Sequence, residues 1–374
     1  MPSFLKKCRI ASLTLFASLC LSQAGLSQAS LGQAWAGETA AIVLDADTGT
    51  ILHSHAIDQA SPPASLAKMM TLYLTFKGLR EQAFLPQTRL KTSAHAARQR
   101  PSRLGLRKGE RITTEQAILA LVTKSANDAA VVLAEAVAES EAGFVERMNE
   151  TAKRLGMKNT QFRNASGLHK RDQVSTARDL ALLAHALFRD FPEYTPYFTV
   201  QKFRFRNRTY RNRNGLLDSY PGADGIKTGY VRASGYNLAA SVRRGKHRFI
   251  GIVLGEKSPV AREKRMRILF DQAFQTAAAI ERSWEIRVGK VARLATAHLV
   301  ASGAARRVPG LLHRAVLSIS PVRDAKGVFY RARFTGIREP LARKACDHLK
   351  LQGIACDIVS PFQAGQVERA WTKS

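Results

Sequence analysis

The stretch SPPASLAKMM at residues 61–70 constrains the fold more than any other part of the chain. Two consecutive prolines cannot lie inside a helix, whereas the apolar run after them is typical of one, so a helix is predicted to begin close to Ser65. Residues three apart share a helical face, which places the Lys68 amine beside the Ser65 hydroxyl. The run is apolar nearly all round, so we expect burial that favours a neutral Lys68 able to accept the serine proton.

The start of this helix would also direct free backbone N–H groups and the positive end of the dipole at the position of an oxyanion. Ser65 is therefore the candidate nucleophile. A Ser-x-x-Lys pair is expected about once by chance in a chain of this length. The competing interpretation of the pair alone is a helix cap with a solvated lysine.

Two further polar motifs adjoin apolar segments. Ser125 and Asn127 lie in a break between predicted helices, where they either face a cleft or cap a helix. Lys227, Thr228 and Gly229 precede two strand-like runs with short connections, which predicts an antiparallel meander with this tripeptide on its edge strand. Taken alone, the tripeptide is equally consistent with a strand that exposes a lysine.

The pattern around these motifs predicts a mixed α and β region. A hairpin is expected at residues 40–44 and 50–53, and a helix from about 260 to 280 is expected to pack on the meander. Most of residues 113–191 read as helices. Residues 202–206 alternate like a half-exposed strand, whose arginines form either a solvated face or one that contacts an anionic polymer.

The N-terminus indicates export. Three cations precede an apolar run at residues 10–21, and a small-x-small site follows at residues 34–36, as in a secretory signal peptide of residues 1–36. The run is short for a retained membrane anchor, and no later stretch is suited to span a bilayer. The formal charge of +29 predicts attraction to polyanions, and export to the cell envelope argues against nucleic acid as the partner.

Two cysteines remain after the predicted signal, Cys346 and Cys356. In an oxidising compartment they form either a disulfide or a pair of buried thiols, and the sequence does not choose between these.

The three motifs, in this order, resemble the penicillin-binding and serine β-lactamase superfamily. The resemblance covers roughly residues 38–280 and is closest in pattern to low-molecular-mass D-alanyl-D-alanine carboxypeptidases, with supporting stretches at residues 174–179, 212–217 and 224–239. It implies an α+β, β-lactamase-like transpeptidase fold, in which helices flank an antiparallel sheet beside a helical subdomain. The catalytic domain would occupy residues 37–282.

The resemblance also implies the catalytic roles. Ser65 would attack the carbonyl between two D-alanines and Lys68 would take its proton, while Ser125 would relay a proton to the leaving amine. Asn127 would hydrogen-bond the substrate backbone and help to hold Lys68. Water would release the acyl-enzyme, so the reaction would need no metal or cofactor.

The same resemblance implies how the substrate is held. Lys227 and Thr228, followed by Gly229, would bind the terminal carboxylate, and the N–H groups of Ser65 and Tyr230 would form the oxyanion hole. β-Lactams would act as inhibitors by acylating Ser65.

After about residue 283 the pattern restarts as two strand-helix-strand halves, which predicts a small α+β domain. Residues 330–336 and 345–356 resemble a SPOR domain, which implies binding to peptidoglycan glycan strands. The alternative is a structural appendage. The expected division is 283–362 for this domain and 363–374 for a tail, without a transmembrane anchor after signal cleavage.

Together these features predict an exported, periplasmic or envelope enzyme that trims the terminal D-alanine from peptidoglycan stem pentapeptides. Two alternatives remain: a D,D-endopeptidase that cuts crosslinks, and a non-catalytic peptidoglycan-binding protein.

Overall fold

The computed structural model describes residues 39–361 except 325–326. The predicted signal peptide and the predicted tail lie outside the described residues. Within the described part of the chain, no helix combines the length and apolar character needed to cross a bilayer.

A five-stranded antiparallel sheet organises the first region, in the order β2-β1-β9-β8-β7. This sheet contains the predicted meander, and β7 is its edge strand. Its strands are β1 (Ala40–Asp45), β2 (Ile51–His55), β7 (Ala223–Val231), β8 (Gly235–Arg244) and β9 (His247–Glu256).

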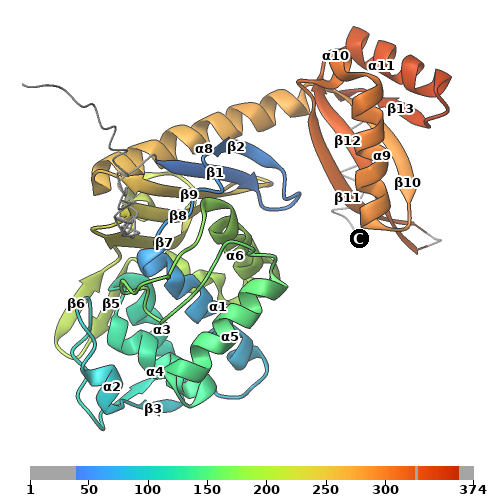
Figure 1. Cartoon of the computed structure of the whole chain (residues 1–374). Helices are drawn as coiled ribbons and strands as arrows, with labels where there is room; N and C mark the ends of the chain where they lie inside the picture. Colours follow the sequence, from blue (N-terminus) through green and yellow to red (C-terminus); the bar gives the residue numbers. More distant parts are fainter. Residues whose placement is uncertain (1–38, 325–326, 362–374) are drawn as a thin grey trace, which may run out of the picture. The chain divides into compact units, whose positions relative to one another are not determined.

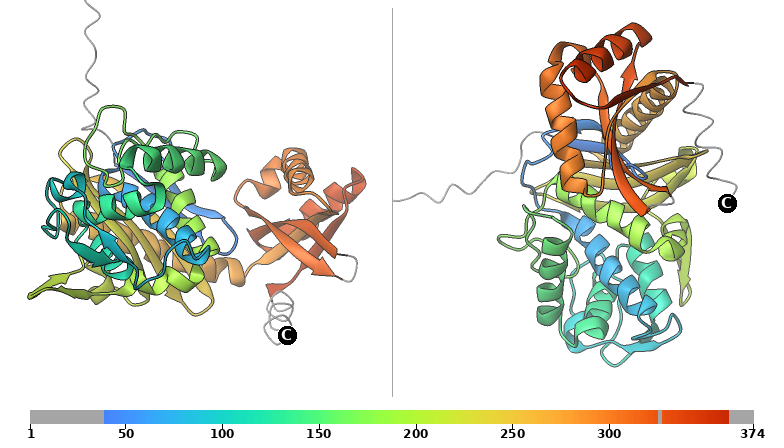
Figure 2. Two further views of the ribbon diagram at one scale, coloured as in Figure 1. Left: turned by 90° about the horizontal axis from the view of Figure 1, so that it is seen from below. Right: turned by 90° about the vertical axis from the view of Figure 1, so that its right-hand side faces the viewer.

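Both faces of this sheet are covered, which explains the continuous apolar sequences of its central strands. Along β1, Ile42 and Leu44 join the core shared with the helical region, whereas Val43 joins a second core beneath α8 (Pro259–Glu281). Figures 1 and 2 show α8 on one side of the sheet and the helices of residues 64–199 on the opposite side. The helix expected at about 260–280 is therefore confirmed.

The helical region surrounds one buried helix, α1 (Lys68–Arg80), which packs on α4 (Asn127–Ala138) and α6 (Ala177–Asp190). The 3₁₀ turn η1 (Ala64–Ala67) precedes α1 directly, so helical structure begins at the predicted position. The other helices are α2 (Ala94–Ala97), α3 (Thr114–Thr123), α4 (Asn127–Ala138), α5 (Glu141–Arg154), α6 (Ala177–Asp190), η2 (Pro192–Thr199) and α7 (Leu216–Ser219).

Two small antiparallel ladders complete this region. They pair β3 (Arg89–Lys91) with β4 (Arg111–Thr113), and β5 (Lys202–Phe205) with β6 (Arg208–Arg211). In β5, Phe203 and Phe205 are buried while the intervening cations are exposed, as the alternating sequence predicts.

The C-terminal region is a four-stranded antiparallel sheet, in the order β11-β12-β10-β13, with its own apolar core. The chain order matches the two predicted strand-helix-strand halves. The elements are β10 (Trp284–Val291), α9 (Leu294–Arg307), α10 (Pro309–Leu312), β11 (Val316–Asp324), β12 (Gly327–Ile337), α11 (Glu339–Leu351) and β13 (Cys356–Val359).

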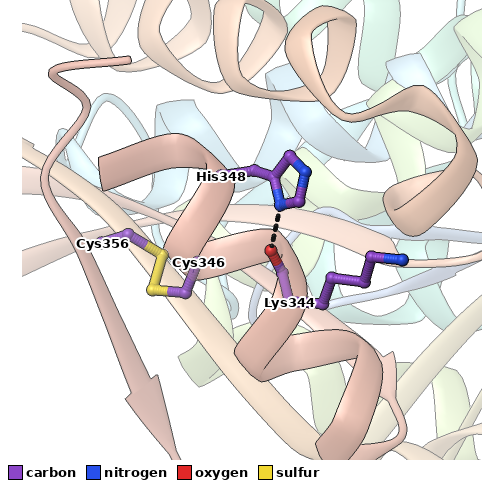
Figure 3. Close-up of a disulfide and its surroundings, with 4 residues drawn as sticks. All are labelled: Lys344, Cys346, His348 and Cys356. Carbon is purple, nitrogen blue, oxygen red and sulfur yellow. Dashed lines mark hydrogen bonds between the residues drawn. A yellow bond between two sulfur atoms is a disulfide. The ribbon is translucent and has the colours of Figure 1, made fainter. Parts of the chain in front are cut away.

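Cys346 of α11 and Cys356 at the start of β13 form a disulfide (Figure 3). Their Cα atoms are 5.5 Å apart, within the usual range for this bond. Of the two states that the sequence left open, the structure has the disulfide. It ties the last helix to the last strand of the C-terminal core.

Candidate active site

Ser65 and Lys68 lie side by side at the junction of η1 and α1. Lys68 Nζ is 3.1 Å from Ser65 Oγ, 2.7 Å from Asn127 Oδ1 and 2.5 Å from the carbonyl oxygen of Ser166. The Lys68 side chain is fully buried, whereas Ser65 is partly exposed. The solvated-lysine alternative is therefore wrong, and the amine faces the serine hydroxyl as the spacing predicts.

The electrostatics of this site suit Lys68 to act as a base. Burial is the main factor that lowers its pKa to about 7, with Arg213 lowering it further and Asp128 opposing the shift. A neutral amine carries two hydrogens and one lone pair. The Asn127 amide oxygen and the Ser166 carbonyl are acceptors and take the two hydrogens, so the lone pair is left for the Ser65 hydroxyl.

Asn127 is held in the orientation that this arrangement requires. Its Nδ2 donates to the carbonyl oxygen of Arg100 at 2.8 Å, which turns its Oδ1 toward Lys68. The predicted contact with Lys68 is thus present. The amide hydrogens that were expected to bind substrate have one partner in the protein already.

Ser125 occupies the break between α3 and α4 with a positive φ of 60°. It is 3% exposed and lines the cleft, and its buried Oγ has no hydrogen-bond partner among the described residues. A buried hydroxyl without a partner is uncommon in proteins, and at a cleft it is available to a ligand. Of the two predicted orientations, the structure has the one that faces the cleft.

The third motif lies on β7, which passes directly beside the nucleophile. A Cβ atom placed on Gly229 would be 3.2 Å from the Ser65 nitrogen, so the strand approaches η1 closely because this residue has no side chain. Thr228, Gly229 and Tyr230 line the cleft. The Ser65 N–H, in the first turn of a helix, has no intrahelical acceptor, as an oxyanion donor requires.

Lys227, on the same strand, has a buried side chain. It is 2% exposed, and its Nζ donates to the carbonyl oxygen of Thr228 at 2.9 Å. Burial lowers its pKa well below the usual value, and the charge of Lys68 lowers it further. The exposed-lysine alternative is therefore wrong, and the Lys227 side chain is not among the residues that line the cleft.

The cleft has a volume of about 480 Å³, which is in the range of small-molecule sites. Two arginines that the motifs did not reveal also line it, Arg213 and Arg262. Arg262, near the start of α8, is 4% exposed, and its Nε has no partner among the described residues. Arg213 donates to Ser102 Oγ at 3.1 Å at the edge of the cleft. Both suit recognition of a carboxylate.

Comparison with known proteins identifies the family. Residues 28–258 match the model of the peptidase S11 family, described as D-alanyl-D-alanine carboxypeptidase. The chain belongs to this family. The region described above has the S11 fold, and its three motifs converge on one S11 cleft.

Individual S11 proteins support the same assignment. D-alanyl-D-alanine carboxypeptidase DacF of Bacillus subtilis is 34% identical over 239 residues, which are 63% of this chain and 61% of DacF. This chain thus spans less than two thirds of that relative. Penicillin-binding protein 5 of Haemophilus influenzae superposes with a TM-score of 0.62 at 31% identity, covering 68% of this chain and 73% of that one.

A further S11-like structure contains a β-lactam. Penicillin-binding protein D2 of Listeria monocytogenes, solved in its ampicillin-bound form, has a TM-score of 0.56 at 31% identity. The match covers 63% of this chain and 96% of that one. These neighbours confirm the predicted penicillin-binding transpeptidase fold.

Proposed function

We propose that this protein is a serine-type D-alanyl-D-alanine carboxypeptidase that removes the terminal D-alanine from peptidoglycan stem pentapeptides. The observation that carries the proposal is the Lys68 amine, which lies 3.1 Å from the Ser65 hydroxyl with its pKa lowered to about 7. A neutral amine at that distance activates a serine without a histidine.

The reaction has two halves. Ser65 Oγ bonds to the carbonyl carbon between the two D-alanines and gives its proton to Lys68, while the N–H groups of Ser65 and Tyr230 hold the oxyanion. The C–N bond then breaks, and the proton returns through Ser125 Oγ to the leaving amine. Water attacks the resulting ester, and free Ser65 is regenerated.

Recognition of the substrate's terminal carboxylate is assigned to one side of the cleft. Thr228 supplies a hydroxyl there, and Arg262 supplies a buried guanidinium with an unpaired Nε. Lys227 contributes by donating to the backbone carbonyl oxygen of Thr228. A buried guanidinium such as that of Arg262 binds a carboxylate tightly because little water competes for it.

The same site would bind β-lactams, because penicillin places a strained amide and a carboxylate in positions like those of the D-alanyl-D-alanine end. The ampicillin-bound structure of the Listeria protein supports this extension. Acylation of Ser65 would then block the enzyme.

The test is labelling of the mature protein with a fluorescent penicillin, followed by mapping of the modified residue by mass spectrometry. We expect label on Ser65 and none in Ser65→Ala, which removes the attacking oxygen. The conservative neighbour variant Ser61→Ala is the control and should label normally. A folded wild-type protein that takes no label would contradict the proposal.

We further propose export to the cell envelope, with the signal peptide at residues 1–36 and a catalytic domain at residues 37–282. The Cys346–Cys356 disulfide supports an oxidising compartment. Peptide sequencing of the secreted form checks this: a first residue near Gly37 is expected, and an intact N-terminus would contradict it.

For residues 283–362 we propose a SPOR-like domain that binds glycan strands. The two-half topology with its separate core supports an independent binding domain. Co-sedimentation with purified peptidoglycan, comparing the full chain with one that ends at residue 282, tests the idea. Equal sedimentation of the two would refute it.

A further inference from the structure

Two segments beside the cleft are strongly basic. Residues 98–111 hold six arginine or lysine side chains and residues 202–213 hold another six, against a single carboxylate, Glu110. Glu110 is itself paired with Arg206. Of these cations only Arg213 lines the cleft, and the catalytic mechanism uses none of the others, so the excess charge is unexplained by the site already described.

The two segments meet at the mouth of the cleft. Arg213, which follows β6, donates to Ser102 Oγ, and both residues line the cleft. The ion pair between Arg206 and Glu110 joins them again farther out. We name residues 98–111 and 202–213 together the basic surface.

The exposed cations of the β5–β6 ladder repel one another. Lys202 lies directly opposite Arg211, both exposed, and facing strand residues with like charges destabilise a ladder. Phe203 and Tyr210, the next facing pair, are turned to the other side. The side chains of Lys202, Arg204 and Arg211 make no hydrogen bond or ion pair with any residue that the structure describes. An anionic ligand would relieve their repulsion.

The other segment is held rigidly in place by the residues after Ser125. The carboxylate of Asp128 accepts hydrogen bonds from the backbone N–H groups of Leu104, Gly105 and Leu106. The Asn127 N–H donates to the Ser102 carbonyl oxygen at 2.7 Å. Because the backbone is already ordered, binding a ligand here would cost little further chain entropy.

We propose that the basic surface binds the free carboxylates of the peptidoglycan strand whose D-alanyl-D-alanine end occupies the cleft. The inference rests on the proposed function, since it assigns a binding surface to a further part of the same substrate. Ser102 and Arg213 line the cleft, so the stem-peptide carboxylates of a strand that extends over this side of the cleft would come within reach of these cations. Guanidinium groups bind carboxylates with two parallel hydrogen bonds. The continuity of the surface with the cleft favours the substrate over an anionic lipid surface.

The test compares two charge-removing variants on two substrates. Lys202→Gln/Arg211→Gln removes the facing pair, and Lys153→Gln/Lys158→Gln removes two exposed lysines at the end of α5 and just after it. The substrates are soluble pentapeptide-containing peptidoglycan strands and a diacetylated Lys-D-Ala-D-Ala tripeptide, whose only carboxylate is the terminal one.

We expect Lys202→Gln/Arg211→Gln to lower kcat/KM on strands by about threefold to tenfold, the ratio that two exposed ion pairs supply, chiefly through KM. Its activity on the tripeptide stays unchanged. Lys153→Gln/Lys158→Gln behaves as wild type on both. Amidation of the strand carboxylates, or a rise in salt concentration, removes the difference between wild type and Lys202→Gln/Arg211→Gln.

Equal losses in both variants, or no loss on strands, would overturn the inference. The inference would also be overturned if Lys202→Gln/Arg211→Gln cleaved strands normally but no longer pelleted with anionic phosphatidylglycerol vesicles. That result would indicate that the surface binds lipid. Failure of wild type to cleave the tripeptide would instead overturn the proposed function, so the two ideas fail separately.

Discussion

The catalytic region and the C-terminal region keep their polar side chains in different places. Residues 39–281 bury five charged side chains: Lys68, Lys227, Arg262, Asp128 and Asp179. In the described part of the C-terminal region, Glu285 is the one charged side chain so deeply buried, and a disulfide supports an otherwise apolar core. Burying a charge costs free energy, so it persists where chemistry needs it.

This contrast predicts different responses to substitution. Changes to buried polar groups of the catalytic region should alter rates by large factors. Changes in the C-terminal region should alter stability or the proposed wall binding and leave the chemistry intact.

The largest effect is expected for Lys68→Met, which keeps the buried volume and removes the base. The second-order rate constant for acylation by a fluorescent penicillin should fall about 10³-fold, as for loss of a general base. Thermal melting should confirm that the variant is folded. A folded variant that loses less than tenfold would show that another group activates Ser65.

Arg262→Gln should lower kcat/KM for the Lys-D-Ala-D-Ala tripeptide by about 30-fold, because a charge-assisted hydrogen bond to the terminal carboxylate is lost. Lys264→Gln, an exposed cation two positions along α8, serves as the control. Similar losses in the two variants would indicate a general effect of charge instead of a carboxylate subsite.

Acylation should depend on pH through Lys68. Its pKa is lowered to about 7, so the reactive neutral amine is the minor form below this pH and the major form above it. The acylation rate should therefore rise about tenfold from pH 6 to pH 8 and then level off. Stopped-flow acylation with a penicillin that does not titrate in this range gives the profile, and a fall over the same interval would rule out the neutral-amine mechanism.

Cys346→Ser/Cys356→Ser should destabilise the C-terminal region by about 3 kcal/mol, the entropy of the short loop that the disulfide closes. Denaturant unfolding followed by the fluorescence of Trp284 measures the change. Acylation of Ser65 should proceed at the wild-type rate. A parallel loss of acylation would mean that the two regions depend on each other.

The smallest effect is expected from ending the chain at residue 282. Tripeptide hydrolysis should stay within about twofold of wild type, because every group assigned to the reaction lies before residue 282. Changes away from such groups usually have small effects. A large loss of activity in the truncated, folded protein would contradict the conclusion that the chemistry belongs to the catalytic region alone.

The sequence predicted those features of the fold that depend on neighbouring residues alone. The proline pair ahead of an apolar run located η1 and α1, and short connections between strand-like runs located the β7–β8–β9 meander. The Ser65 and Lys68 pairing followed from helical spacing alone.

The rest of the site depends on tertiary contacts that no short pattern contains. Arg262 reads as one of many cations on a surface helix, and it reaches the cleft only because α8 packs against the sheet. The Ser166 carbonyl, which holds Lys68, is a backbone group and carries no signal in the residue type. The family resemblance supplied the roles of Ser125 and Thr228, whereas spacing alone left them open.

On the proposed function, the two glycines beside Ser65 restrict how the protein could become resistant to a β-lactam. A Cβ on Gly167, whose φ is +75°, would lie 1.8 Å from the Ala64 carbonyl oxygen, and one on Gly229 would press on the Ser65 nitrogen. The atoms that such a Cβ would meet belong to the backbone, which cannot change rotamer as a side chain can. A larger residue at either position would therefore displace Ser65 and impair the enzyme as well as binding of the drug. Selection under β-lactams should therefore act at the rim of the cleft, on residues such as Leu168 and Ser102.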